Sequence, residues 1–97
     1  PFAITMELSP YYYLWAKMKI IFRNLSRSTT EFQIRELFAQ FAELEYCTLV
    51  LDKETGKSKG FGFVEINDEK KALLSIVRLN GLKLDGKEIR VKKASDE

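Results

Sequence analysis

The sequence predicts an α+β fold in which strands and helices alternate in the order βαββαβ. Two segments carry apolar residues at helical spacing, and four short β-prone segments are bounded by turn residues. This order implies one four-stranded antiparallel sheet that is backed on one face by two helices. The 97 residues, 45% of them hydrophobic, suffice for one small core, so we expect a single domain.

The first strand and the first helix open this periodic region. Residues 19–23 are apolar, rich in Ile and Phe, and followed by a polar loop, which predicts a strand. The next segment has the i, i+3, i+4, i+7 spacing of an amphipathic helix at Ile34, Leu37, Phe38 and Phe41. Either Ser28 with Glu31 or Thr30 with Gln33 can form a capping box at its start.

The second and third strands flank a turn-rich basic loop at residues 52–57. Residues 46–51 are apolar and β-prone, and residues 60–66 predict the third strand. Strand alternation should place three residues of the second strand on one face: Cys47, Leu49 and Leu51.

The second helix and the last strand complete the predicted fold. Asn67 or Asp68 caps the helix, which ends at residues 80–81, an Asn-Gly pair that tolerates a left-handed backbone. Its buried side should carry Ala72, Ile76 and Leu79. A strand at residues 88–92 follows an Asp-Gly turn at residues 85–86. Its inward residues should be Ile89 and Val91.

The segment KGFGFVEI, residues 59–66, is the most informative part of the chain. Strand alternation places Phe61, Phe63 and Glu65 on the face opposite Val64. Because the helices cover the face that bears Val64, two aromatic rings should lie on the open face, where large apolar groups mark a contact surface. The glycines beside them weaken the strand, which is tolerable where something approaches the sheet closely.

This segment resembles the octamer signature of the RNA recognition motif family. Seven of its eight positions fit, and Ile66 departs from the aromatic residue of the last position. The resemblance runs from about Lys19 to Ala94 and includes the first helix, the basic loop and the last strand. It implies a ferredoxin-like βαββαβ sandwich that binds single-stranded RNA on its sheet.

The hexamer motif of that family falls at residues 20–25, and its second position, normally an outward aromatic residue, is Ile21. Phe22 does not replace the missing ring, because alternation turns it toward the helices. Ile21 can offer apolar contact to a base or sugar but no ring stacking. Since stacking contributes ~1–3 kcal/mol per base, the sequence predicts weaker affinity or a shorter read than a three-ring sheet.

Basic residues surround the two rings, although the formal net charge of the chain is only +2. Rings combined with cations are typical of proteins that bind single-stranded nucleic acid. Bases would stack on the rings, Arg90 and Lys92 would bond base edges, and the other cations would hold phosphates. RNA follows from the resemblance, and single-stranded DNA stays open as a ligand. The candidate RNA-binding residues are Lys19, Ile21, Arg23, Lys57, Lys59, Phe61, Phe63, Glu65, Arg90, Lys92 and Lys93.

Catalysis is not expected, and neither is a cofactor, a metal or a small-molecule substrate. The chain has no histidine, and its one cysteine, Cys47, has an apolar neighbourhood typical of a buried, inert thiol. No glycine-rich phosphate loop of the P-loop kind occurs. The alternative function is a protein interaction module of the same fold that holds a partner on its sheet or its helices.

An aromatic extension precedes the periodic domain, so we divide the chain into residues 1–18, 19–94 and a tail at 95–97. Ser9 and Pro10 suit the start of a short helix, with Tyr11, Leu14 and Trp15 at helical spacing. Packing against the domain or self-association with a second copy is the preferred interpretation. The alternatives are disorder, nucleic-acid contact and a membrane-proximal segment.

Charges interrupt the apolar runs of the N-terminal third, and none reaches the ~18–20 residues that span a bilayer. A membrane partner is therefore not expected. The sequence shows no secretion signal and has a lone cysteine, so we expect an intracellular protein, cytoplasmic or nuclear.

Overall fold

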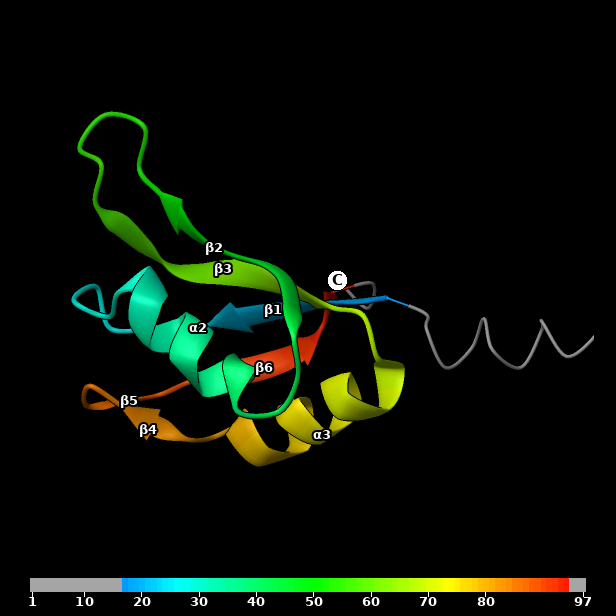
Figure 1. The fold of residues 1–97 in the computed structure, drawn as a ribbon. Helices are drawn as coiled ribbons and strands as arrows, with labels where there is room; N and C mark the ends of the chain where they lie inside the picture. Colours follow the sequence, from blue (N-terminus) through cyan, green and yellow to red (C-terminus); the bar gives the residue numbers. More distant parts are fainter. Residues whose placement is uncertain (1–16, 95–97) are drawn as a thin grey trace, which may run out of the picture.

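The computed structural model describes residues 17–94, which form a layer of strands and a layer of helices (Figure 1). The helices are α2 (Glu31–Ala39) and α3 (Glu69–Leu79), and a short hairpin follows α3, formed by β4 (Lys83–Leu84) and β5 (Lys87–Glu88). The sheet consists of β1 (Met18–Arg23), β2 (Leu44–Leu51), β3 (Ser58–Ile66) and β6 (Arg90–Lys93). The helix expected from Ser9 onward and the tail at 95–97 lie outside the described residues.

The sheet has the strand order β2-β3-β1-β6, and every neighbouring pair is antiparallel. Both helices lie on one side of it, and the other side stays open (Figure 1). The predicted βαββαβ sandwich is thus confirmed. Because β1 and β3 are the two central strands, residues of the two family motifs lie side by side, with Ile21 paired to Phe63.

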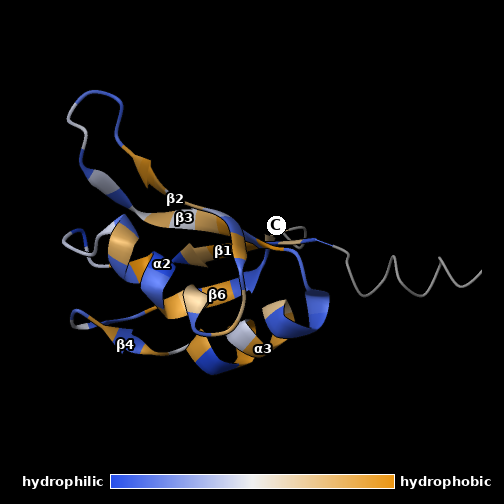
Figure 2. Cartoon of the chain, in the orientation of Figure 1, coloured by the Kyte–Doolittle hydropathy of each residue, from blue (hydrophilic) through white to orange (hydrophobic). Residues whose placement is uncertain are grey.

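The core lies between the sheet and the helices. Phe22 from β1 and Phe38 from α2 are both fully buried, and their ring centroids lie 5.8 Å apart. Val64 and Ile66 of β3 and Ile89 are also fully buried, as strand alternation predicted. Figure 2 shows apolar residues along the central strands, while the helices alternate between hydrophobic and hydrophilic bands.

At the start of each helix, the structure shows which of the two possible capping residues forms the cap. Thr30 caps α2: its hydroxyl accepts from the Gln33 amide at 3.2 Å, and the Gln33 side chain accepts from the Thr30 amide at 2.8 Å. Asp68 caps α3 by accepting from the Lys71 amide at 3.2 Å. Helix α2 ends at a right-handed residue, Gln40, rather than at the left-handed glycine at which many helices end.

The last predicted strand, residues 88–92, is wrong as one continuous element. The chain first makes the β4–β5 hairpin, whose turn residues Asp85 and Gly86 have φ values of 51° and 88°. Ile89 then leaves the ladder, because its amide donates to the Leu82 carbonyl at 2.9 Å and its carbonyl accepts from the Gly81 amide at 2.8 Å. Strand β6 starts only after it.

Strand β2 begins two residues earlier than predicted and has a register shift beside Glu45. Its outer edge bonds to α2: the Leu49 amide donates to the Glu31 carboxylate at 3.0 Å. Leu51 was predicted on the same face as Cys47 and Leu49, which are buried, but it is 51% exposed. Helix α2 begins level with Leu49, so it does not cover Leu51 at the end of the strand.

Candidate nucleic-acid interface

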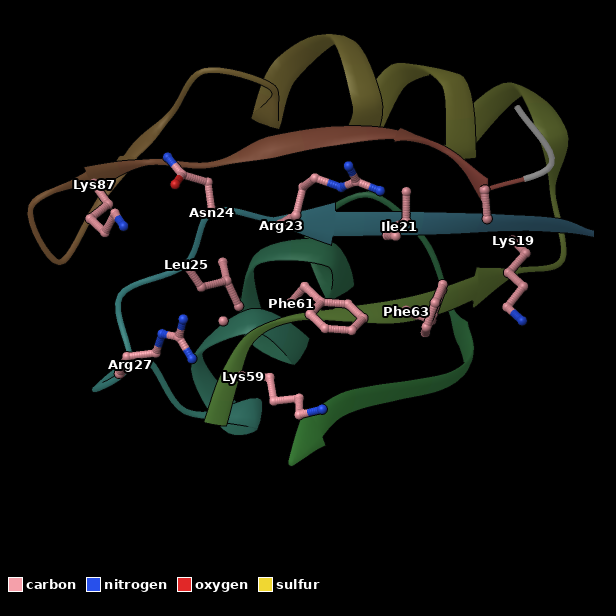
Figure 3. A pocket seen from close by; sticks show the side chains of 12 residues that line it. Lys19, Ile21, Arg23, Asn24, Leu25, Arg27, Lys59, Phe61, Phe63 and Lys87 are labelled. Atoms are coloured by element: carbon pink, nitrogen blue, oxygen red, sulfur yellow. The ribbon is translucent and has the colours of Figure 1, made fainter. Parts of the chain in front are cut away.

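Phe61 and Phe63 lie on the open face of the sheet (Figure 3). Both side chains are half-buried, whereas Gly62 and Val64 are buried on the helix side. The ring centroids are 6.2 Å apart and the ring planes meet at 82°, which is an edge-to-face pair. Because the two ring faces point in different directions, each ring can stack on a base of its own.

The glycine between the two rings serves the core. A Cβ atom on Gly62 would lie 2.7 Å from Cζ of Phe22, and closer still to the backbone oxygen of Thr48. We expected glycine where something approaches the sheet closely, and at this position the approaching groups are a core ring and a neighbouring strand. Gly62 therefore lets β3 carry two adjacent outward rings above a tightly packed inner face.

A hollow of about 760 Å³ opens beside the rings, between β1, β3 and the loop after β1 (Figure 3). Its lining combines Phe61, Phe63 and Ile21 with five cationic side chains and contains no carboxylate. The five cations are Lys19, Arg23, Arg27, Lys59 and Lys87. The hollow therefore presents an apolar floor inside a positive field, although the chain as a whole is nearly neutral.

Ile21 lines this hollow from β1 and is only 4% exposed. It is buried without belonging to the core cluster, because its neighbours on the open face cover it. Its paired residues are Phe63 on one side and Lys92 on the other. The predicted apolar contact to a ligand is therefore small, and most of the stacking surface comes from β3.

Lys19 lies over Phe63, with its Nζ atom 4.6 Å from the ring centroid, in a cation–π contact. Its cross-strand partner is Glu65, which in turn pairs with Tyr46 of β2. Burial, and then the Glu65 carboxylate, raise the pKa of Tyr46, so its hydroxyl stays a hydrogen-bond donor. The Lys19 ammonium group thus covers one face of the Phe63 ring.

Three other predicted site residues, Lys57, Arg90 and Lys92, lie in hollows next to this central hollow, and Lys93 does not. Arg23, Arg90 and Lys92 line an adjoining hollow of about 320 Å³ where β1 meets β6. Lys57 lies on the opposite side, in the hollow under the β2–β3 loop. Lys93 pairs with the buried Ile20, so strand alternation directs Lys93 to the helix side of the sheet, away from the rings.

A family model described as the RNA recognition motif matches residues 20–90. The chain belongs to the RNA recognition motif family. Its octamer and hexamer motifs occupy β3 and β1, the two central strands, which is why their outward residues share one hollow.

Relatives and solved structures agree with this assignment. Over 80% of its length the chain is 40% identical to "Glycine-rich RNA-binding protein 2, mitochondrial" of Arabidopsis thaliana, of which it covers 49%. It is 38% identical to human "Cleavage stimulation factor subunit 2", of which it covers 13%. The chain thus spans half or less of these relatives.

Among solved structures, "RNA Binding Protein PG1" is 35% identical, with a TM-score of 0.77 over 79% of this chain and 93% of that one. The Sex-lethal RNA recognition domains 1 and 2 from Drosophila melanogaster are 27% identical, with a TM-score of 0.76 over 79% of this chain and 49% of that one. The fold of this RNA recognition motif is therefore shared with both.

Sequence reasoning missed three polar side chains that line the central hollow: Asn24, Arg27 and Lys87. All three lie in or next to loops, where strand alternation gives no direction. Asn24 has a left-handed backbone with φ of 63°, and its side-chain Nδ2 donates to the Glu88 carbonyl at 2.7 Å, which joins β1 to the hairpin. A basic residue in a polar loop, such as Arg27, was the only signal available.

Two further findings concern residues 17–94 alone. No cluster of three or more potential metal-ligating side chains occurs within this range. Neither of its helices is long and apolar enough to cross a membrane.

Proposed function

We propose that this RNA recognition motif binds a short stretch of single-stranded RNA across the open face of its sheet. Two bases stack on Phe61 and Phe63, and the surrounding lysines and arginines hold the phosphates. The observation that carries the proposal is the hollow that joins two rings to five cationic side chains without a carboxylate. Membership of the family and the similarity to a glycine-rich RNA-binding protein support it.

Single strands fit this surface better than duplexes, because a stacked and paired base does not offer its face to a ring. Before binding, the Lys19 ammonium group lies 4.6 Å from the centroid of the Phe63 ring. When a base takes its place on the ring, the ammonium group is close enough to hold an adjacent phosphate. Arg90 and Lys92 at the β6 edge bond base edges or phosphates of the same strand. The chain's own groups thus supply stacking and charge without any cofactor.

The lack of carboxylates in the central hollow also favours RNA over a peptide on the sheet, because a polyanion gains from every cation there. Non-enzymatic binding is the proposed activity, in keeping with the family. We place this binding inside the cell, in line with the mitochondrial relative.

The double variant Phe61→Ala, Phe63→Ala tests the proposal. Losing two stacked bases at ~1–3 kcal/mol each should weaken binding by ~2–6 kcal/mol, roughly 30-fold to 10⁴-fold. Fluorescence anisotropy with a pool of short single-stranded RNAs measures the affinity, and circular dichroism checks the fold. The matched control is Phe32→Ala, which removes a ring that is 68% exposed on α2.

Affinity of the wild type should also fall as salt rises from about 50 to about 200 mM, with a slope of roughly −0.7 per phosphate held. A double variant that stays folded and binds as the wild type does would refute stacking on β3. A flat salt response would refute the role of the cations. Matching single-stranded DNA in the same assay measures how much the 2′-hydroxyl contributes.

A further inference from the structure

A second hollow of about 450 Å³ adjoins the central one, under the β2–β3 loop. The two hollows share three wall residues: Arg27, Lys59 and Phe61. Beyond that wall, the second hollow is lined by Asp52, Thr55, Lys57 and Ser58. A nucleic-acid strand whose base stacks on Phe61 can therefore continue past Arg27 into a space that is large enough for a small organic group.

The Arg27 guanidinium is held in place before any ligand arrives. Its Nη1 donates to the Ser58 carbonyl at 3.1 Å, the one hydrogen bond it makes within residues 17–94. A Cβ on Gly60 would lie 3.3 Å from its Nε atom, so the side chain lies against the β3 backbone. The Leu25 amide also donates to the Gly60 carbonyl at 2.9 Å and fastens the loop.

A guanidinium has five N–H donors in one plane, and this arrangement matches a phosphate. Figure 3 shows Arg27 beside the start of β3, at the end of the hollow opposite Lys19. Lys59 comes from the same end of β3, so two cations flank the passage between the hollows. The shared wall is therefore where a phosphate gains most.

The interior of the second hollow differs from the shared wall, because a carboxylate, Asp52, lines it together with Lys57. The Asp52 Oδ1 atom accepts from the Glu54 and Thr55 amides at 2.8 and 3.0 Å. These backbone hydrogen bonds lower the pKa of Asp52, so the group is ionised at neutral pH. The Asp52 carboxylate offsets the attraction of Lys57 for a phosphate there, whereas a base can exchange hydrogen bonds with either group.

We propose that Arg27 binds the phosphate that joins the nucleotide on Phe61 to its neighbour, and that the neighbour's base occupies the second hollow. This inference rests on the proposed function, since it extends the strand that stacks on the rings. It adds one nucleotide to the stretch of RNA that the domain contacts, and it gives the β1–α2 loop a role in affinity. In this way the domain regains a third base contact at a place other than Ile21.

The test compares Arg27→Gln with the wild type on single-stranded RNA oligonucleotides from about two to about six residues long. In the wild type, affinity should rise when a residue is added beyond the dinucleotide. In Arg27→Gln the longer oligonucleotides should bind roughly tenfold more weakly, as for a lost hydrogen bond to a charged group, and the salt slope should decrease by about 0.7. Dinucleotide affinity should change little.

Two further variants serve as controls. Arg78→Gln removes an exposed cation from α3, away from the hollows, and should leave every affinity and salt slope unchanged. Arg27→Lys keeps the charge but lacks the planar fork, so it should keep the salt slope and lose part of the affinity. Thermal unfolding of each variant shows whether loss of the Ser58 bond has altered the fold.

Equal affinity of Arg27→Gln and the wild type at every length would overturn the inference. So would an equal loss at every length together with a lower melting temperature, which would assign Arg27 a structural role. The proposed function fails separately, if removing Phe61 and Phe63 leaves binding of the longest oligonucleotide unchanged.

Discussion

Replacing Gly62 by alanine should destabilise the domain through its core, although this residue lies between the two stacking rings. The added Cβ would lie 2.7 and 2.8 Å from two atoms of the Phe22 ring. Carbon atoms pack best at about 3.5–4.0 Å, so the ring would have to move by roughly 0.8 Å or more. The Thr48 carbonyl oxygen is nearer still and belongs to the paired strand β2, which cannot yield as a side chain can.

Overpacking a filled core costs ~1–3 kcal/mol, and with backbone on one side and a buried ring on the other we expect about 3 kcal/mol. In a domain of this size, each 1 kcal/mol lowers the melting temperature by about 4–8 °C. The expected decrease is therefore roughly 12–24 °C. Since small domains are stable by about 5–15 kcal/mol, the variant should still fold at room temperature.

Thermal unfolding followed by circular dichroism measures this loss, with Gly56→Ala as the control. Gly56 has a φ of 75° and no atom within 4 Å of an added Cβ, so its replacement costs only the backbone strain of about 1–2 kcal/mol. Equal melting temperatures of Gly62→Ala and the wild type would refute the packing argument. If that unchanged stability were accompanied by lost RNA binding, the glycine would serve the ligand instead.

Two more predictions concern a missing ring and a buried thiol. Ile21→Phe should place a third ring above the hollow and tighten RNA binding by ~1–3 kcal/mol, roughly 5- to 150-fold. The control Ile21→Leu should leave the affinity unchanged. Equal affinities of Ile21→Phe and the wild type in anisotropy assays would contradict this prediction. Burial raises the pKa of Cys47 to about 11, whereas the unfolded thiol ionises near 9.0. The difference in free energy of unfolding between the wild type and Cys47→Ala should therefore be constant below pH ~9 and decrease toward pH ~11. Urea unfolding across that range measures the difference, and a pH-independent value would rule the effect out.

The order of strands and helices could be predicted because it depends on local periodicity. The stripe at Ile34 and Phe38 and the alternation through Val64 and Ile66 each reflect one buried face, and all four residues are fully buried. The last strand could not be predicted as it is, because the Ile89 backbone exchanges hydrogen bonds with residues 81–82, a contact outside its own segment. Strand periodicity does not distinguish a residue that pairs in the sheet from one that bonds a loop.

For the candidate interface too, some features could be predicted from the sequence and others could not. The rings at Phe61 and Phe63 and their open face followed from alternation and from the octamer motif, since side-chain direction in a strand has a period of two. The sequence did not indicate that Ile21 would be nearly buried, or that Arg27 would lie between two hollows. Those facts depend on neighbouring strands and loops.

By itself, the sequence determined the fold, the family and the two aromatic residues at the centre of the sheet, because each of these is expressed in local patterns of apolar, aromatic and turn residues. Only the tertiary structure decided the positions of the cations around the rings and the reason for the glycine between them. Arg27 is 31 residues from the Ser58 carbonyl it bonds, and Gly62 makes room for a ring 40 residues before it. Contacts over such separations form when strands pair, and no window of sequence contains both partners.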